Sequence, residues 1–248
     1  MYGIFDFHSH ILPGIDDGSH SVDESIALLY KEAEQGIAHV VATPHFYPQH
    51  DTPEHFLSKR AEAEKLLREE MAKHSGLPTL SVGAEVYYFS GIGSSEIMAD
   101  LTIDGKRYIL VEMPTPPWTD AMYRDLEDLY TKQGLIPIIA HLDRYIGRFR
   151  TFGIPERLKE LTVLVQANAE FFLRKATSSM ALRMLKNENI HLLGSDCHNL
   201  SSRAPNLGEA LELIEKRLGK APLTAVQEYQ ESVLQDNDVE NAHKGAIL

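Results

Sequence analysis

The sequence of 248 residues holds a single cysteine, Cys197, and no long hydrophobic run. One cysteine cannot form an intramolecular disulfide, which is typical of a protein in a reducing compartment. No apolar segment approaches the roughly 18 residues of a transmembrane helix, and the first residues have neither the basic nor the apolar region of a signal peptide. We therefore expect a cytoplasmic protein with no membrane insertion.

Basic residues are also scarce. Lys and Arg total 24 against 36 Asp and Glu, so the formal net charge is −12. A nucleic-acid-binding surface requires clustered basic residues, which this sequence lacks, so we expect no nucleic-acid partner. An anionic substrate would need positive charge from a few arginines or from bound metal. The length and the 43% of hydrophobic residues suit one domain over residues 1–248.

Short apolar segments rich in Val and Ile alternate with longer amphipathic segments, a pattern typical of βα units around a parallel sheet. The capping box from Ser21 to Glu24 predicts a helix start, and Gly36 predicts the end of that helix. Pro53 and Pro205 lie near other predicted helix starts. Further helices are expected at about 54–73, 119–133, 178–188 and 206–218. Seven strands are expected, at 3–7, 38–42, 80–84, 108–112, 136–140, 162–167 and 190–194.

Nearly every predicted strand ends in a residue that can bind metal. These residues are His8, His10, His45, Glu85, Glu112, His141, Asp196 and His198. In a β/α barrel the carboxyl ends of the strands converge on one mouth, whereas an open doubly wound sheet spreads them in a row. The pattern therefore favours an α/β fold of the barrel type.

Residue spacing supports a shared metal site at that mouth. His8 and His10 stand at positions i and i+2, which face the same side of a strand, and a second such pair follows the last strand. Imidazoles with carboxylates suit Zn, Mn or Fe. Each residue alone is compatible with a solvated strand end, but six of seven predicted strands share the pattern. With Asp17 the candidates number nine, too many for one ion, so we expect two or three ions bridged by Glu85 or Asp196.

Two metal ions acting together are typical of hydrolytic sites, where they activate water and bind the attacking and leaving oxygens. Arg144 and Arg203 follow candidate ligands by a few residues and are placed to bind phosphoryl oxygens. For each arginine alone, a surface salt bridge is the alternative. Together these residues predict metal-assisted hydrolysis of a phosphoester.

Several segments together resemble the PHP (polymerase and histidinol phosphatase) superfamily. They are His8-Ser9-His10, Asp16-Asp17-Gly18, Thr43-Pro44-His45, Gly83-Ala84-Glu85, and the stretches 139–145 and 195–199. Within that superfamily they are similar to the bacterial manganese-dependent protein-tyrosine phosphatases of capsule and exopolysaccharide gene clusters, in order from about residue 4 to residue 205. The resemblance implies a distorted (β/α)7 TIM-like barrel with three metal ions, manganese above all, at its mouth.

The resemblance also implies a role for each matching residue. His8, His10, Glu85 and Asp196 match ligands of a first metal, Glu85, Glu112 and His141 of a second, and Asp17, His45 and His198 of a third. Arg144 and Arg203 match phosphate-binding arginines, and with Asp17 they are the expected catalytic residues. The implied reaction is attack of metal-activated hydroxide on phosphotyrosine. The implied partner is the cytoplasmic tail of a tyrosine kinase that controls capsular or extracellular polysaccharide synthesis.

Three alternatives remain open. The residues from Cys197 to Arg203 spell the Cys-x5-Arg signature of cysteine-based phosphatases, but they include no glycine, and Cys197 alternates away from its ligand neighbours. A small-molecule phosphatase, such as a histidinol phosphatase, would use the same metals. A non-catalytic metal-binding module is the third. The segment 46–52, which contains Tyr47, does not map onto the family pattern.

Overall fold

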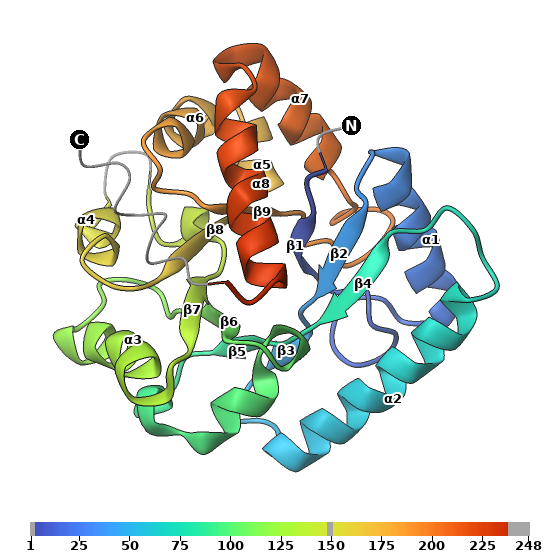
Figure 1. The fold of residues 1–248 in the computed structure, drawn as a ribbon, viewed down its shortest axis with the longest axis horizontal. Helices are drawn as coiled ribbons and strands as arrows, with labels where there is room; N and C mark the ends of the chain where they lie inside the picture. The colour runs from blue at the N-terminus through green and yellow to red at the C-terminus, as the bar shows by residue number, and fades with distance from the viewer. Residues whose placement is uncertain (1–2, 148–150, 238–248) are drawn as a thin grey trace.

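The structure, a computed structural model, describes residues 3–147 and 151–237. Strands and helices alternate along this part of the chain (Figure 1). All seven predicted strands are present within a few residues of their expected bounds. They are β1 (Asp6–Ser9), β2 (His39–Ala42), β4 (Thr79–Val82), β6 (Tyr108–Glu112), β7 (Ile136–Ile139), β8 (Leu164–Asn168) and β9 (Leu192–Gly194). The expected domain of residues 1–248 extends past the described residues at both ends.

The sequence pattern does not predict two short strands, β3 (His45–Phe46) and β5 (Glu85–Tyr87). They follow β2 and β4 after brief interruptions that contain Pro44 and Gly83. Proline has no N–H to donate to a strand partner. A Cβ at Gly83 would lie 3.0 Å from a side-chain carbon of Ile103, so the chain approaches its neighbour closely there. Each interruption therefore redirects its strand toward a new partner.

All strand pairs are parallel. β1, β2 and β4 form one hydrogen-bonded sheet, and a second runs in the order β3-β5-β6-β7-β8-β9. β1 also bonds to the segment after β9: the His8 carbonyl accepts from Asp196 N–H at 2.8 Å, and the Cys197 carbonyl accepts from His10 N–H at 2.9 Å. The strands therefore form a curved parallel arrangement in a mixed α/β fold (Figure 1).

The five predicted helices are present. They are α1 (Val22–Glu34), α2 (Pro53–Met71), α3 (Asp120–Gln133), α6 (Ser178–Lys186) and α7 (Leu207–Leu218). Ser21 Oγ accepts from Glu24 N–H as predicted, but the Glu24 carboxylate accepts from His20 N–H rather than from Ser21. Gly36 follows α1 with φ +80°, a left-handed conformation that glycine adopts readily.

Additional helices were not expected from the sequence. They are α4 (Ile154–Leu158), α5 (Ala169–Leu173), α8 (Ala221–Leu234) and the 3-10 turns η1 (Ile92–Ser94), η2 (Glu96–Leu101), η3 (Ile103–Gly105) and η4 (Leu142–Arg144). No helix in residues 3–147 and 151–237 combines the length and the apolar character needed to cross a bilayer.

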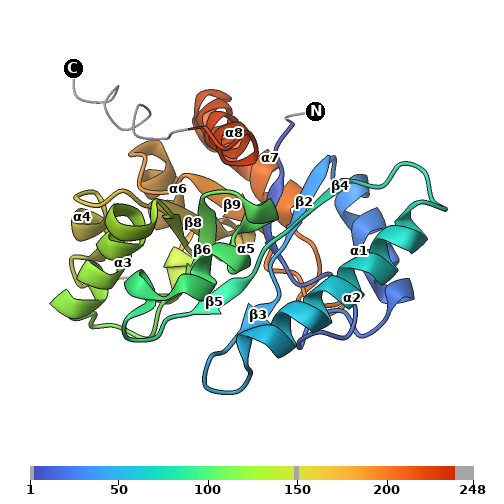
Figure 2. The same cartoon turned by 60° about the horizontal axis from the view of Figure 1, so that its bottom comes forward.

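α8 covers the amino ends of the strands. The Gln230 side chain accepts from Phe5 N–H at 3.0 Å and donates to the Phe5 carbonyl at 2.7 Å, just before β1. Tyr229 and Val233 of α8 join an apolar cluster drawn from the strands, which includes Leu110 and Leu164. Figure 2 shows α8 and the loop between β3 and α2 on opposite sides of the strands. The carboxyl ends of the strands, and the polar residues that follow them, therefore lie at the end of the strands opposite α8.

Candidate metal centre

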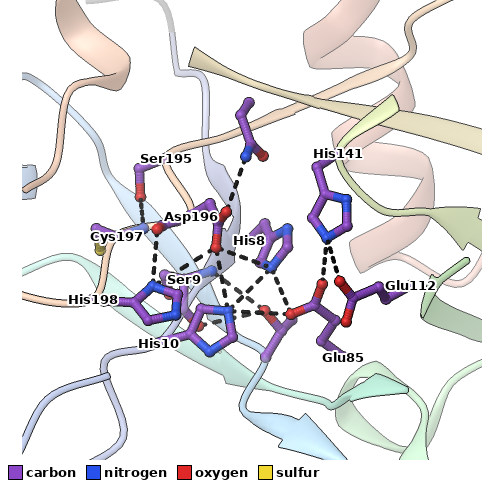
Figure 3. Close-up of polar contacts among 12 residues, drawn as sticks. His8, Ser9, His10, Glu85, Glu112, His141, Ser195, Asp196, Cys197 and His198 are labelled. Carbon is purple, nitrogen blue, oxygen red and sulfur yellow. Dashed lines mark hydrogen bonds and ion pairs between the residues drawn. The ribbon is translucent and has the colours of Figure 1, made fainter. Parts of the chain in front are cut away.

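The structure brings all nine predicted ligands into one cluster at the carboxyl ends of the strands, most of them visible in Figure 3. They are His8, His10, Asp17, His45, Glu85, Glu112, His141, Asp196 and His198. The side chains of His8, His10, Glu85 and His141 are fully buried, whereas that of Asp17 is 66% exposed. The cluster therefore has a buried floor and one open side.

The first group combines residues of β1 and the segment after it, of β5, and of the segment after β9. The Nε2 atoms of His8 and His10 are 3.2 Å apart. Glu85 Oε2 lies 3.2 Å and 3.3 Å from those two nitrogens, and Asp196 Oδ1 lies 3.6 Å and 3.4 Å from them. Ligand atoms about 2.1 Å from a tetrahedral ion are about 3.4 Å from one another. These four side chains therefore have the spacing of a single coordination sphere.

Two further groups flank the first. His141 Nε2 lies 2.7 Å from Glu85 Oε1 and 3.5 Å from Glu112 Oε1. On the other side, Asp17 Oδ1 lies 3.5 Å from His45 Nε2 and 3.4 Å from His198 Nε2. Glu85 presents one carboxylate oxygen to His141 and the other to His8 and His10, which is the geometry of a bridging carboxylate.

Several buried polar atoms in the cluster lack a hydrogen bond. Within the described chain they include Glu85 Oε2, Glu112 Oε2 and His198 Nε2. A buried polar atom without a partner costs about 1–3 kcal/mol. Divalent cations bound by the three groups would satisfy these atoms, since carboxylate oxygens and imidazole nitrogens are the ligands that Zn, Mn and Fe accept. The residues present therefore fit divalent metal.

The charges of the cluster also fit cation binding. Burial opposes ionisation of Glu85, yet His8 and the neighbouring imidazoles hold the pKa of Glu85 well below its ordinary value. Burial likewise opposes ionisation of Asp196, but His8 and His10 hold the pKa of Asp196 well below its usual range. Burial and the nearby His10 lower the pKa of His198 to about 4, so this imidazole is neutral, the form that ligates metal. The carboxylates of Glu85 and Asp196 thus remain charged at neutral pH and require positive charge beside them.

Asp16 orients two of the candidate ligands, although the sequence pattern assigned only its neighbour Asp17. Its Oδ2 accepts from His10 Nδ1 at 2.7 Å and from the His45 backbone N–H at 3.0 Å. The first bond places a proton on His10 Nδ1, which would leave Nε2 to face a bound metal ion. A Cβ at Gly18 would lie 2.2 Å from the His10 carbonyl oxygen, so this turn requires glycine. An aspartate two residues before a glycine was the available signal.

Two amides on β8 connect the groups. Gln166 Oε1 accepts from His141 N–H at 2.6 Å and lies 3.3 Å from His8 Nδ1. Its amide nitrogen donates to Asn168 Oδ1 at 3.0 Å, and the Asn168 amide donates to Asp196 Oδ2 at 2.9 Å. β8 is the strand with no predicted ligand at its end. Two amides at alternate positions of a buried strand were the only signal of this role.

Both predicted phosphate-binding arginines stand at the open side of the cluster. Arg144 donates to Glu112 Oε1 at 3.0 Å and to Asp196 Oδ2 at 2.8 Å. Arg203 donates to Asp196 Oδ1 at 2.9 Å. The Arg144 and Arg203 side chains are 40% and 36% exposed, so both remain accessible to a ligand. Asp196 thus holds both guanidinium groups beside the candidate metal ligands.

Cys197 faces away from this cluster. It is fully buried, and its sulfur lies near the carboxylates of Asp6 and Glu32. Burial, Glu32 and Asp6 raise the pKa of the Cys197 thiol well above its ordinary value. A buried thiol of this kind is a poor nucleophile, which argues against the cysteine-based mechanism.

Comparisons with known proteins agree with this geometry. Residues 4–237 match the family model described as capsular polysaccharide synthesis, CpsB/CapC. The tyrosine-protein phosphatase CpsB of Streptococcus pneumoniae is 28% identical over 226 residues, which cover 87% of this chain and 91% of that relative. The tyrosine-protein phosphatase YwqE of Bacillus subtilis is 26% identical over 246 residues, covering 95% of this chain and 93% of the relative.

A solved structure matches the whole fold. It comes from work on YwqE of Bacillus subtilis and CpsB of Streptococcus pneumoniae, described there as unique metal-dependent tyrosine phosphatases. The match has a TM-score of 0.80 at 25% identity and covers 95% of this chain and 96% of the other. These findings confirm the family resemblance seen in the sequence: the chain belongs to the CpsB/CapC family of capsular polysaccharide synthesis.

Proposed function

We propose that this protein is a metal-dependent phosphatase that hydrolyses phosphotyrosine in protein substrates. The observation that carries the proposal is the single cluster of imidazoles and carboxylates with two accessible arginines at its open side. The names of the relatives and the description of the solved structure support the same activity. A pocket that joins divalent ions to guanidinium groups suits a phosphoryl group, which carries negative charge on several oxygens.

The proposed ligand set follows the three groups in the structure. A first ion is assigned to His8, His10, Glu85 and Asp196, a second to Glu85, Glu112 and His141, and a third to Asp17, His45 and His198. Bound ions would lower the pKa of water and polarise the phosphoryl group. The family resemblance favours manganese, although iron and zinc accept the same side chains.

The arginines supply the substrate contacts in this proposal. Arg144 and Arg203 each have exposed guanidinium N–H groups beside Asp196. On substrate binding they would donate to phosphoryl oxygens and offset the charge that develops there during hydrolysis. Asp17, the most exposed candidate ligand, completes the proposed catalytic set at the same opening.

We also propose that the fold is a distorted (β/α)7 barrel and that residues 1–248 form one PHP-type domain. The bonds between β1 and the segment after β9 support closure, and β2 with β3, and β4 with β5, would each count as one barrel strand. The proposed protein partner is a tyrosine kinase that controls polysaccharide synthesis, and the proposed location of the protein is the cytoplasm. The family description and the lone, unpaired cysteine support that setting.

Turnover of a phosphotyrosine peptide, measured together with elemental analysis before and after chelation, tests the proposal. We expect two or three ions per chain, loss of turnover on chelation and recovery on adding Mn²⁺. Histidinol phosphate serves as the competing substrate. Faster turnover of histidinol phosphate would replace the proposal with a small-molecule phosphatase, and metal binding without any hydrolysis would indicate a non-catalytic module.

A further inference from the structure

A cavity of about 400 Å³ opens beside the metal centre, lined by the turn that contains Asp17 and by the segment that follows β3. Its lining residues are Ile15, Asp16, Asp17, His45, Tyr47, His50 and Asp51. Asp17 and His45 belong to the candidate metal centre, so the cavity and the centre are continuous. A ligand whose phosphoryl group lies at the centre can therefore extend into this cavity.

Tyr47 is the aromatic wall of the cavity. Its ring stacks on His45 with centroids 5.0 Å apart and an interplanar angle of 29°. On another side it meets Tyr87 of β5 at 5.6 Å, and its hydroxyl lies 3.2 Å from His45 Nδ1. These contacts hold the half-buried ring in one orientation at the rim of the metal centre.

The charge of the cavity indicates which part of a substrate it accepts. Three aspartates line it, and no Lys or Arg is among its described lining residues. A second phosphate group would be disfavoured there, because three aspartates line the cavity and the nearby Arg203 is already paired, with Asp17 at 3.7 Å and with Asp196 at 2.9 Å. An uncharged aromatic ring suits the same space, since it packs on Tyr47 without needing a counter-charge.

We propose that Tyr47 is a specificity-determining residue whose ring packs against the phenyl ring of phosphotyrosine. This inference rests on the proposed phosphatase function. An aryl phosphate carries its ring one oxygen away from phosphorus, so the ring lies at the rim of the metal centre where Tyr47 stands. A phosphoserine side chain has no ring to make this contact. Tyr47 thereby favours aryl over alkyl phosphoesters.

Inhibition by two non-hydrolysable phosphonates tests the contact directly. Benzylphosphonate carries the ring, with a CH2 group in place of the ester oxygen, and methylphosphonate has no ring, while both offer the same oxygens to the metals and arginines. Since an aromatic pair contributes a few-fold to about tenfold in affinity, Tyr47→Ala should raise the inhibition constant of benzylphosphonate by about that factor. The constant for methylphosphonate should stay within about twofold. Tyr47→Phe, which keeps the ring, should behave as the parent does.

Turnover of a phosphotyrosine peptide is measured on the same proteins, with metal content as a check on folding. Tyr47→Ala should raise KM and change kcat little. Tyr30→Ala is the matched control, because Tyr30 is 38% exposed on α1 and contacts His74 rather than the metal centre. It should leave both inhibition constants unchanged.

The possible results separate this inference from the function on which it rests. A parent protein that leaves the phosphotyrosine peptide intact overturns the proposed function and this inference with it. If the parent is active, an equal loss for both phosphonates in Tyr47→Ala shows that Tyr47 only supports His45 and overturns the inference alone. The inference is also overturned if Tyr47→Ala keeps the parent's preference for the phosphonate with the ring. The same holds if Tyr47→Phe loses as much affinity for that phosphonate as Tyr47→Ala does.

Discussion

Replacing Gln166 by leucine tests whether the amides of β8 tune the metal centre. Gln166 is fully buried, and leucine is close to it in volume, so the change removes hydrogen bonds without opening a large cavity. The His141 N–H loses its acceptor at 2.6 Å, and His8 Nδ1 loses the oxygen at 3.3 Å that orients its ring. Asn168 also loses the donor that holds it toward Asp196.

Gln166→Leu should therefore have two separable effects, one on the free energy of unfolding and one on metal affinity. The unsatisfied buried N–H of His141 should lower the free energy of unfolding by about 1–3 kcal/mol, with or without metal. Loss of an orienting partner of a metal-binding histidine typically costs about 10- to 100-fold in metal affinity. That factor equals about 1.4–2.8 kcal/mol, and it should appear only as reduced stabilisation when Mn²⁺ is present.

Calorimetric titration with Mn²⁺ and urea unfolding, each with and without chelator, separate these effects. Gln230→Leu is the matched control: Gln230 is equally buried and bonds to the Phe5 backbone, but it lies on α8 at the other end of the strands. It should lose similar stability and keep the metal affinity of the parent. If Gln166→Leu also bound Mn²⁺ as tightly as the parent, the amides of β8 would have no part in holding the metal.

Further predictions concern catalysis, the lone cysteine and acid stability. Arg144→Ala should lower kcat by about 100-fold with unchanged metal content; parental turnover would remove Arg144 from the mechanism. Cys197→Ser should keep kcat within about threefold, whereas inactivity with metals still bound would revive the thiolate mechanism. Burial lowers the pKa of His39 to about 4, so its imidazole is neutral when folded and the unfolded chain binds the proton more readily. His39 therefore contributes stability above pH 6.5 that is lost as the pH falls toward 4, by about 3 kcal/mol. His39→Gln should flatten this loss in urea unfolding between pH 7 and pH 4.5; an unchanged slope would contradict it.

The sequence predicts the candidate metal ligands better than it predicts the residues around them. Histidines and carboxylates directly after apolar strands are conspicuous, and parallel strands bring their carboxyl ends together, so all nine candidates could be placed at one opening. Gln166 and Asn168 carry no charge, and amides in strands are common. Their bonds to His141 and Asp196 depend on which strands become neighbours, which no local pattern reveals.

The fold, like the site, can be predicted only in part from local sequence patterns. Strand positions follow from apolar runs, but the division of β2 from β3 and of β4 from β5 depends on close packing, as at Gly83 against Ile103. The sequence pattern did not predict α8, although its residues Tyr229 and Gln230 cover the amino ends of the strands. Several of its contacts are with residues far away in the sequence, such as the hydrogen bond of Gln230 to Phe5 at a separation of 225 positions.

The seam between β1 and the segment after β9 joins opposite ends of the chain: Ser195 N–H donates to Asp6 across 189 positions. An ion shared by His8 and Asp196 would act as a crosslink at this seam, much as a disulfide does in a secreted protein. Closing a loop of that length with a covalent bond is worth about 5 kcal/mol of unfolded-state entropy. In a cysteine-poor chain, metal supply would thus govern how firmly β1 stays attached to the segment after β9, and loss of metal would weaken this seam.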